Sequence, residues 1–472
     1  MADSFDLVVI GGGSGGYVGA IRAAQYGLSV ALVERARLGG TCLHSGCIPT
    51  KVFLESADLL DRMRRADELG ISASGIKLDF GAVAARKEKI VSANEQGVRG
   101  HLKSNRVEEI AGDGSLAGPN EVLVSAEDGQ RRLKTRNLLL ATGSRPKSLP
   151  GLEIDGDRVV SSDHVTGWRE LPKSILVAGA GAVGAEFASA MADFGVEVTL
   201  VEFLPRVLPL EDAEVSPIVA RNFGRRGIKL LTGARILPET LKREKRSVSI
   251  EVEVGKERQR LGAERLLVAI GREPVTDGLG VEKTRAKINQ RGFVEVDRYM
   301  RTAEPGVYAC GDVVGGLMLA HVAYQEGKVA AATMAGRPVP PIDYDAMPRA
   351  TYTRPEVASV GLTEEQARER GPALKVGRFR FGANPKALIH GEAEGLVKIL
   401  TDEASGEILG AHLVGPHVTE LIAEPTVAKL LESTALEIAL AVHPHPTLSE
   451  ALNEAAADVD GLAIHAPHRR PS

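Results

Sequence analysis

Two cysteines stand five residues apart in GGTCLHSGCIPTK, residues 39–51. In a regular helix Cys42 and Cys47 would be separated by a rise of about 7.5 Å along the axis, whereas a disulfide needs Cα atoms within about 7 Å. Gly46 and Pro49 loosen this turn, because Pro49 has no N–H to bond the carbonyl four residues earlier. A bridge across a distorted turn is strained and easily reduced. The pair therefore predicts a redox-active disulfide.

The same stretch leaves other interpretations open. Cys42, His44 and Cys47 could bind a metal, although tetrahedral zinc needs a fourth ligand and none is close in sequence. The two thiols could also be buried structural cysteines. His44 itself is predicted to be an exposed loop residue. The glycine pair before Thr41 indicates that a helix opens there, and the field at a helix N-terminus would favour a thiolate.

A second group that could do chemistry is HPHPTLSE, residues 443–450. His445 stands between two prolines, which constrain its backbone. Glu450 follows after a turn, within reach of the ring. Because a carboxylate on the far nitrogen fixes the tautomer of an imidazole and raises its basicity, the motif predicts a base. His443 is the alternative base, and a proline-rich turn with solvated histidines is the interpretation without chemistry.

The elements that must position these groups begin with a repeated pattern. FDLVVIGGGSGGYVGAIRAAQYGLSVALVE, from residue 5, and SILVAGAGAVGAEFASAMADFGVEVTLVE, from residue 174, both predict strand, glycine loop, helix and strand. Such a loop admits a pyrophosphate at the helix N-terminus, and the acid that ends the second strand accepts hydrogen bonds from ribose hydroxyls. Two copies predict two dinucleotide sites. The residues are Gly11, Gly13, Gly16 and Glu34 in the first copy and Gly179, Gly181, Gly184 and Glu202 in the second.

Further segments complete the pattern. NLLLATGSRP (137–146) and RLLVAIGREP (265–274) are matched strand-to-turn stretches. GVYACGD (306–312) predicts a strand ending at Asp312, where doubly wound sheets bind ligands. From about residue 346 the pattern is that of antiparallel strands and an amphipathic helix. The last eight residues are predicted to be a loose tail.

Composition excludes several classes of protein. The 472 residues allow two to four domains. The 58 Lys and Arg against 62 Asp and Glu give a net charge of −4, which does not favour nucleic acid or an anionic membrane as a partner. The apolar runs are too short to span a bilayer. The start of the chain shows no signal peptide, so we expect a cytoplasmic protein. Three cysteines in such a chain are not a disulfide framework.

LGGTCLHSGCIPTK, the two glycine motifs, ACGD with MLAH, and HPHPTLSE together resemble the pyridine nucleotide–disulfide oxidoreductases, from about residue 5 to residue 465. The resemblance implies an α/β fold with two Rossmann-like dinucleotide-binding domains and a C-terminal α+β dimerisation domain. The implied order is an FAD-binding domain at 1–150, an NAD-binding domain at 151–276, a central domain completing the FAD site at 277–345, and an interface domain at 346–472.

The resemblance also implies roles for the reactive residues. Cys47 would be the flavin-proximal thiol, and Cys42 would meet the substrate. His445 and Glu450, supplied by the other subunit, would move the proton of the dithiol. Between the cysteines, many relatives have a different loop, but the chemistry does not depend on it.

The remaining implied residues hold cofactors. Lys51 would lie along the flavin, paired with Glu186, and a surface ion pair of little weight is the alternative. Cys310 is expected to be a small strand residue with no role in catalysis. No metal ligand is expected. The FAD-side residues would be Gly11, Gly13, Gly16, Glu34, Thr142, Gly143, Asp312, Met318 and Ala320, and the NAD-side residues Gly179, Gly181, Gly184, Glu202 and Gly271.

The implied activity is FAD-dependent dihydrolipoamide:NAD⁺ oxidoreductase, acting on the lipoyl groups of 2-oxoacid dehydrogenase or glycine-cleavage complexes. A homodimer with a shared active site is expected. Glu202 favours NAD, because a carboxylate repels a 2′-phosphate, and Arg206 is the nearest basic residue. The alternatives are an NAD(P)H-dependent reductase of another small disulfide, similar to glutathione reductase, and a non-catalytic FAD-binding redox sensor.

Overall fold

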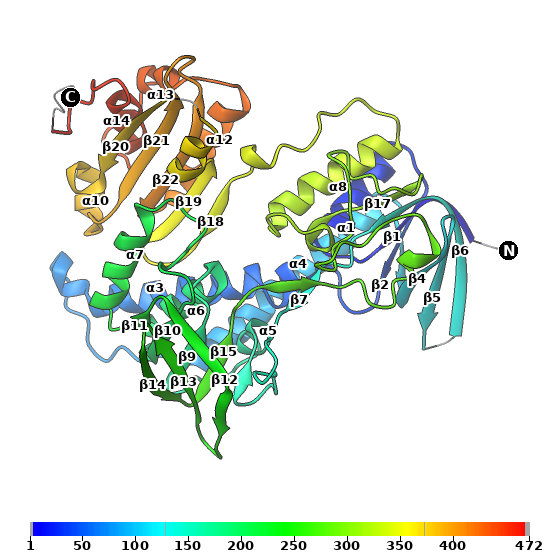
Figure 1. Cartoon of the computed structure of the whole chain (residues 1–472), viewed down its shortest axis with the longest axis horizontal. Helices are drawn as coiled ribbons and strands as arrows, with labels where there is room; N and C mark the ends of the chain where they lie inside the picture. The colour runs from blue at the N-terminus through cyan, green and yellow to red at the C-terminus, as the bar shows by residue number, and fades with distance from the viewer. Residues whose placement is uncertain (1–2, 128, 372, 468–472) are drawn as a thin grey trace. The chain divides into compact units, whose positions relative to one another are not determined.

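The computed structural model describes residues 3–127, 129–371 and 373–467 (Figure 1). The chain divides into two compact units. The first unit comprises Met1–Val52, Gly81–Lys147 and Gly271–Tyr344. The second unit comprises Phe53–Phe80, Ser148–Ile270 and Asp345–Ser472. Residues 468–472 of the predicted tail lie outside the described residues.

A parallel sheet forms the centre of the first unit. Its order is β3-β2-β1-β6-β5-β4, with β17 parallel to β6. Strands β3, β2, β1 and β6 are parallel, and β5 and β4 extend the sheet antiparallel. The strands are β1 (Asp3–Ile10), β2 (Val30–Glu34), β3 (Glu108–Ala111), β4 (Asp113–Gly118), β5 (Glu121–Ala126), β6 (Gly129–Leu140) and β17 (Val307–Ala309). The buried runs at 7–10 in β1 and 30–33 in β2 are continuously apolar, because both faces of a parallel sheet are covered.

Helices α1 (Ser14–Gln25) and α8 (Ala320–Met334) pack against each other in the first unit (Figure 1). Glycine permits the close approach: a Cβ on Gly327 would lie 2.5 Å from the Gly15 carbonyl oxygen. The unit also holds α2 (Gly40–His44), the antiparallel pair β7 (Ser144–Pro146) and β16 (Arg272–Pro274), η2 (Val281–Lys283) and η3 (Gly311–Val314). Helices α3 (Cys47–Arg64) and α4 (Phe80–Ser104) contribute residues to both units.

The second unit contains a second parallel sheet, in the order β11-β10-β9-β15-β8. Its strands are β8 (Val159–Val160), β9 (Ser174–Ala178), β10 (Glu197–Val201), β11 (Lys229–Leu231) and β15 (Arg265–Val268). An antiparallel sheet accompanies it, formed by β12 (Ala234–Arg243), β13 (Val248–Val254) and β14 (Glu257–Ala263). The helices of this part are η1 (Ala66–Leu69), α5 (Ser162–Thr166), α6 (Ala182–Phe194) and α7 (Val215–Arg225).

The C-terminal part of the second unit is built on an antiparallel sheet. Its order is β18 (Arg349–Thr351), β19 (Glu356–Gly361), β22 (Ile408–Gly415), β21 (Leu396–Asp402) and β20 (Leu374–Arg380). Helix α14 packs on β20 and β21 (Figure 1). The other helices are η4 (Tyr344–Ala346), α9 (Glu364–Glu369), η5 (Phe381–Ala383), α10 (Pro385–His390), α11 (Val418–Leu421), α12 (Ala423–Leu430), α13 (Ala435–Leu440) and α14 (Glu450–Asp458).

The predicted fold class is confirmed, with two parallel α/β sheets that each carry a glycine motif and an antiparallel sheet covered by helices. The first residue of the predicted loose tail, His465, is instead tied down, since its N–H donates to Glu454 at 3.0 Å and its Nδ1 lies 2.7 Å from the same carboxylate. Among the described residues, no helix is both long and apolar enough to cross a membrane. The division into four domains stays a prediction.

Candidate active site

The first glycine loop has no room for side chains. Gly11 has φ +104°, and a Cβ there would lie 2.3 Å from the Ala141 carbonyl oxygen. A Cβ on Gly16 would lie 1.9 Å from the Gly11 carbonyl oxygen. The third glycine of the motif therefore lets α1 close against its own loop. The resulting turn leaves free N–H groups at the start of α1, which is the arrangement that binds phosphates.

Glu34 ends β2 and closes the first motif. Its two carboxylate oxygens accept hydrogen bonds from the N–H groups of Gly12 and Ala36, each at 2.7 Å. A carboxylate offers about four acceptor positions. Glu34 can therefore hold the glycine loop and still accept hydrogen bonds from a ribose.

The second glycine loop repeats this geometry in the second unit. Gly179 has φ +102°, and a Cβ there would lie 2.4 Å from the Ala269 carbonyl oxygen. A Cβ on Gly184 would lie 1.9 Å from the Gly179 carbonyl oxygen. Glu202 accepts hydrogen bonds from the N–H groups of Ala180 at 2.6 Å and Leu204 at 2.8 Å. A Cβ on Gly181 would meet no atom within 4 Å, so this position faces open space.

The cysteine pair lies at the predicted break in the helix. Helix α2 ends at His44, Ser45 has the non-helical φ of −139°, and α3 begins at Cys47. Both cysteines are thiols in this structure, and their side chains share a hydrogen bond. The broken helix thus brings the two sulfurs together, as a bridge between them requires.

A helix opens at Gly40, as the glycine pair indicated, and Cys42 lies in this helix beside a second sulfur. That the helix field favours a thiolate in this pair stays a prediction. The hydrogen bond with Cys47 and burial raise the pKa of Cys42 well above its usual value. The hydroxyl of Ser14 and the charge of Lys51 oppose this rise without cancelling it. Helix α2 has only five residues, and two adjacent sulfurs resist ionising together.

His44 is not the exposed loop residue that was predicted. Its ring is partly buried, and its Nε2 lies 2.7 Å from the Leu38 carbonyl oxygen. The residues that the structure describes contain no group of three or more His, Cys, Asp or Glu side chains arranged to hold a metal ion.

Asp312, in η3, is held by residues that the sequence did not single out. The Ser144 hydroxyl donates to its carboxylate, and Arg272 Nε lies 3.7 Å from it. Arg272 also donates to Ser144 Oγ at 2.7 Å, and its Nη2 lies 3.5 Å from Thr41 Oγ1. Ser144 and Arg272 belong to the matched stretches GSRP and GREP, whose similarity was the available signal. The antiparallel pairing of β7 with β16 brings the two stretches together.

A buried carboxyl supports the same loop from behind. Glu326 of α8 is 1 % exposed and accepts a hydrogen bond from the Gly311 N–H at 2.6 Å. The Tyr344 hydroxyl donates to its other oxygen at 2.8 Å. Burial raises the pKa of Glu326 to about 7, and Asp312 adds to the rise, while the two hydrogen bonds oppose it. Nothing in the sequence alone distinguished Glu326 from other helical glutamates.

The remaining first-unit residues implied to bind a cofactor lie at turns and at a helix start. Thr142 Oγ1 donates to the Val275 carbonyl at 2.6 Å, and the Gly143 carbonyl accepts from the Val275 N–H at 3.0 Å. Gly143 and Gly271 have positive φ of +75° and +123°. Met318, with φ +48°, precedes α8, and Ala320 is the first residue of α8.

The histidine motif lies in the C-terminal part of the second unit. His445 Nδ1 is 2.9 Å from Glu450 Oε1, and the Thr447 N–H donates to Glu450 Oε2 at 2.8 Å. Burial raises the pKa of Glu450, but the Thr447 N–H and His445 outweigh it, so the net pKa is lowered. The His445 side chain is 69 % exposed. An ionised carboxylate on Nδ1 leaves Nε2 as the ring nitrogen that can accept a proton.

The sequence could not choose between His443 and His445 as the base, and the structure distinguishes them. Both nitrogens of His443 are engaged, Nδ1 with the Ala441 carbonyl and Nε2 with Glu424, each at 2.9 Å. The His443 side chain is only 9 % exposed. His445 is therefore the histidine that is free to meet another group.

Lys51 and Glu186 belong to different units. Glu186 is buried, and its Oε1 accepts from the Tyr352 N–H at 2.9 Å. Lys51 acts on Cys42 through its charge. The ion pair between them stays a prediction.

Comparison with known proteins places this geometry in a family. Residues 5–327 match the family model described as Pyridine nucleotide-disulphide oxidoreductase, and residues 347–456 match the dimerisation domain of the same family. The chain is 44% identical to the dihydrolipoyl dehydrogenase of Bacillus subtilis, covering 98% of this chain and 100% of the relative. It is also 44% identical to the dihydrolipoyl dehydrogenase of Zymomonas mobilis, with the same coverage of 98% and 100%.

Solved structures support the same family assignment. LpdA from Mycobacterium tuberculosis superposes with a TM-score of 0.90 at 30% identity, covering 97% of this chain and 100% of that one. The flavoprotein disulfide reductase RclA from Escherichia coli, solved as a Cu(II) complex, gives 0.86 at 26% identity, covering 97% and 100%. Two glycine loops, a contacting thiol pair and these matches lead to one conclusion: the chain belongs to the pyridine nucleotide-disulphide oxidoreductase family.

Proposed function

We propose that the chain is a dihydrolipoyl dehydrogenase, an FAD-dependent dihydrolipoamide:NAD⁺ oxidoreductase. The observation that carries the proposal is the contact between the Cys42 and Cys47 side chains beside Ser14, the first residue of the helix that follows the first glycine loop. This contact places a reversible sulfur pair next to a dinucleotide loop. The names of the relatives with 44% identity support the same activity.

FAD and NAD are the cofactors of this family. The loops fit them, since the second glycine of each motif leaves the helix start open: a Cβ on Gly181 would meet no atom within 4 Å, and one on Gly13 only Gly40 at 3.9 Å. FAD would be held by the first loop, Glu34, Asp312 and the turn at Thr142 and Gly143, with Met318 and Ala320 at its other end. NAD would be held by Gly179, Gly181, Gly184, Glu202 and Gly271. Bound FAD would supply the passage of an electron pair from the dithiol to NAD⁺.

The sulfur chemistry needs only the two cysteines and the substrate. In the oxidised protein, a thiolate of dihydrolipoamide attacks the Cys42 sulfur, which breaks the bond to Cys47 and forms a mixed disulfide. The second substrate thiol then attacks the substrate sulfur of that mixed disulfide and releases Cys42. The substrate loses two electrons and two protons and closes its own disulfide. The protein pair gains the two electrons and becomes a dithiol.

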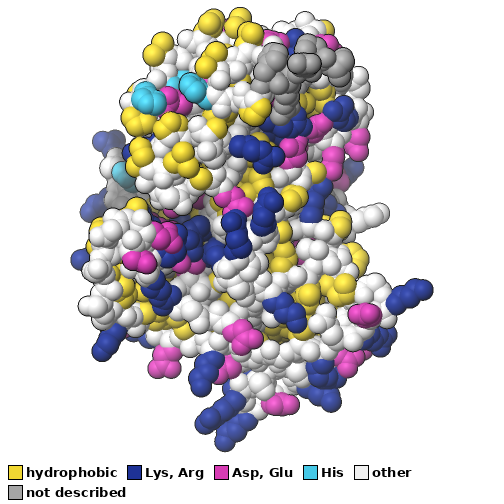
Figure 2. All heavy atoms as spheres, turned by 90° about the vertical axis from the view of Figure 1, so that its left-hand side faces the viewer, with side chains coloured by type: hydrophobic (Ala, Val, Ile, Leu, Met, Phe, Trp, Pro, Cys, Tyr) yellow, Lys and Arg dark blue, Asp and Glu magenta, His cyan; other side chains and the backbone are white. Residues whose placement is uncertain are grey.

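His445 would accept the proton of the attacking thiol at Nε2, while Glu450 holds Nδ1. The family supplies such a base from the other subunit, so the proposal includes a homodimer with a shared active site. Apolar side chains of the dimerisation part support an interface, since Val442 next to His443 is 97 % exposed. Figure 2 shows hydrophobic and histidine side chains gathered in the upper part of the face that it draws.

NAD is the proposed coenzyme rather than NADP. Glu202 is 7 % exposed and holds its negative charge at the end of β10, where it would repel a 2′-phosphate. Lys51 and Glu186 are proposed to pair beside the flavin. The proposed partners are lipoyl domains of a 2-oxoacid dehydrogenase complex in the cytoplasm, and the proposed domain limits are 1–150, 151–276, 277–345 and 346–472.

The test is a lipoamide assay on purified protein with Cys42→Ser and Cys310→Ser as a matched pair. We expect Cys42→Ser to keep its flavin and lose dihydrolipoamide oxidation by at least about 1,000-fold, because the attacked sulfur is gone. Cys310→Ser should stay active, since Cys310 is fully buried and outside the pair. Full lipoamide activity of Cys42→Ser would refute the assignment.

The same assay separates the alternatives. Activity with oxidised glutathione and NADPH, but not with lipoamide and NADH, would identify a reductase of another small disulfide. Flavin-containing protein that is inert with both substrate pairs would identify a redox sensor.

A further inference from the structure

The segment at residues 203–214 follows Glu202, the carboxylate that is proposed to face the coenzyme. Its Arg206 is the basic residue nearest to Glu202 in the sequence, and Arg206 is already paired. Arg206 donates to Glu365 through Nη1 and Nη2, each at 3.0 Å, and Nη2 also lies 3.4 Å from the Pro209 carbonyl oxygen. Two parallel N–H···O bonds of this kind fix the guanidinium in one orientation. Glu365 belongs to α9, in the C-terminal part of the second unit.

The start of the segment is fixed on Glu202 itself. The Leu204 N–H donates to Glu202 at 2.8 Å, and the Gly233 N–H donates to the Leu204 carbonyl at 2.9 Å. The backbone therefore turns tightly around the carboxylate before it reaches Arg206. Only three residues separate Glu202 from Arg206, so Arg206 belongs to the short stretch that follows the carboxylate.

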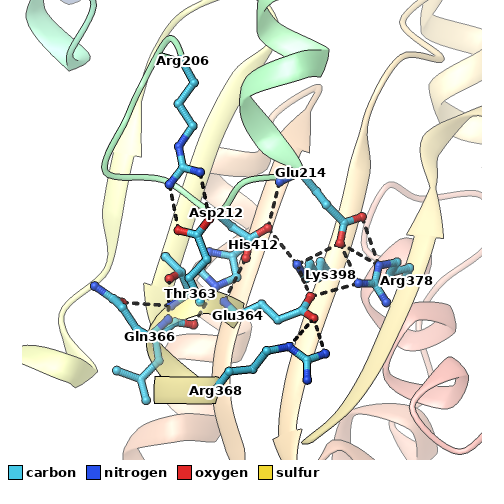
Figure 3. Close-up of polar contacts among 12 residues, drawn as sticks. Arg206, Asp212, Glu214, Thr363, Glu364, Gln366, Arg368, Arg378, Lys398 and His412 are labelled. Atoms are coloured by element: carbon cyan, nitrogen blue, oxygen red, sulfur yellow. Dashed lines mark hydrogen bonds and ion pairs between the residues drawn. The ribbon is translucent and has the colours of Figure 1, made fainter. Parts of the chain in front are cut away.

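The far end of the segment is fixed by a buried network, which Figure 3 shows together with Arg206. Asp212 is 1 % exposed, accepts from Lys398 Nζ at 2.8 Å, and accepts from the Glu364 N–H at 3.0 Å. Glu214 pairs with Arg378 at 2.6 Å and with Lys398 at 2.9 Å. Charges buried in a paired network of this kind are costly to separate. Both ends of the segment therefore keep Arg206 within reach of Glu365.

We propose that Glu365 is a specificity-determining residue, which keeps Arg206 from binding the 2′-phosphate of NADP. The proposal rests on the proposed role of the second glycine loop as the NAD site. A 2′-phosphate needs a cation to offset the repulsion of Glu202, and arginine binds phosphate with two hydrogen bonds. In this chain the Arg206 guanidinium instead pairs with the Glu365 carboxylate in the C-terminal part of the second unit. Discrimination against NADP thus has two sources, the repulsion by Glu202 and the withheld arginine.

The ion pair is partly exposed, with side chains 28 % and 56 % exposed, so its loss should not unfold the protein. We expect Glu365→Gln to release Arg206 and to tighten NADP⁺ binding about fivefold to tenfold relative to NAD⁺. The readout is the ratio of the two dissociation constants, measured by titration calorimetry on the flavin-containing protein. Because it needs no lipoamide turnover, a failed lipoamide assay and a failed specificity test remain distinguishable.

Two further variants make the test decisive. Glu365→Asp keeps the carboxylate and should leave the ratio within about twofold of the unchanged chain. In the double variant Arg206→Ala with Glu365→Gln, the gain for NADP⁺ should disappear. An unchanged ratio in Glu365→Gln, or a gain that persists without Arg206, would overturn the proposal. A weaker NADP⁺ affinity after Arg206→Ala alone would also overturn it, since Arg206 would then already bind the coenzyme.

Discussion

The two glycine loops of this chain have almost the same geometry and different neighbours. In both, a Cβ on the third glycine would lie 1.9 Å from the carbonyl oxygen of the first, and a glutamate accepts two backbone N–H groups. All three cysteines belong to the first unit, where Ser14 contacts Cys42 directly after the loop. The second loop is followed by the segment at residues 203–214. In this segment Phe203 is 67 % exposed and Asp212 accepts a hydrogen bond from Lys398.

This difference shows how one motif can take two roles. The motif fixes a turn that admits a pyrophosphate, and it fixes nothing else. The reaction is decided by what the next elements bring to the loop. Helix α2 brings a sulfur to the first loop, whereas the second loop is followed by Arg206, which pairs with Glu365.

Gly16→Ala and Gly184→Ala test this comparison with the largest expected effect. Each adds a Cβ at 1.9 Å from a backbone oxygen that cannot yield cheaply. We expect Gly16→Ala to be purified without flavin, and Gly184→Ala to keep its flavin while NAD⁺ affinity falls by about 100-fold or more. Visible absorption measures the flavin, and titration calorimetry measures the coenzyme.

Gly97→Ala is the matched control for these two substitutions. Gly97 lies within α4, and a Cβ there would meet no atom within 4 Å. We expect a stabilisation of about 0.5–1 kcal/mol and no change in either cofactor, because alanine is favoured within a helix. If Gly184→Ala released flavin, or Gly16→Ala spared it, the two loops would not have separate roles.

A pH series sharpens the comparison through two buried carboxyls. Burial raises the pKa of Glu326, beside Asp312 in the first unit, to about 7. Burial also opposes ionisation of Asp212 in the second unit, but His412 and Lys398 outweigh it and lower its pKa to about 2. Because its pKa is higher in the folded protein, Glu326 stabilises the fold at pH values below about 4.5, which is its pKa in the unfolded chain. This stabilisation is lost as pH rises toward 7. Asp212 instead stabilises above its unfolded value near 3.8, and its contribution is lost only as pH falls toward 2.

Glu326→Gln should therefore gain stability relative to the unchanged chain between pH 5 and pH 8. The upper bound is about 3 kcal/mol, since one pKa unit corresponds to about 1.4 kcal/mol. Urea denaturation of both proteins at several pH values measures the difference in unfolding free energy. A difference that stays constant across this range would show that Glu326 does not titrate there.

Glu34→Gln and Glu202→Gln give the smallest expected effect. A glutamine has one acceptor oxygen in place of two, so one backbone N–H in each loop loses its partner. We expect about a tenfold loss of flavin affinity in Glu34→Gln and about a tenfold loss of NAD⁺ affinity in Glu202→Gln. Flavin release on dilution measures the flavin affinity, and titration calorimetry measures the NAD⁺ affinity. Loss of flavin from Glu202→Gln would contradict the division of roles.

Much of this arrangement could be predicted because it is local in sequence. The glycine spacing and the acid 23 residues later specify a strand, a turn and a helix that touch one another directly. Gly46 and Pro49 predicted the break that brings Cys42 to Cys47.

Sequence reasoning was weakest for the contacts that individual side chains make. His44 was predicted to be an exposed loop residue, yet it is partly buried and bonds the Leu38 carbonyl. A thiolate was predicted from the helix that opens near Thr41, but the local pattern did not show that contact with Cys47 and burial raise the pKa of Cys42. Ser144 and Arg272 are 128 residues apart, and only the pairing of β7 with β16 places both on Asp312.

By itself the sequence determined two nucleotide folds, a sulfur pair and a histidine with its carboxylate, since each depends on residues a few positions apart. Only the tertiary structure decided which histidine is free, which carboxyl has a raised pKa, and where the charge of Arg206 goes. Those properties depend on burial and on partners from other elements. A local pattern limits the backbone, but the solvation and the pairing of a side chain are set by the whole fold.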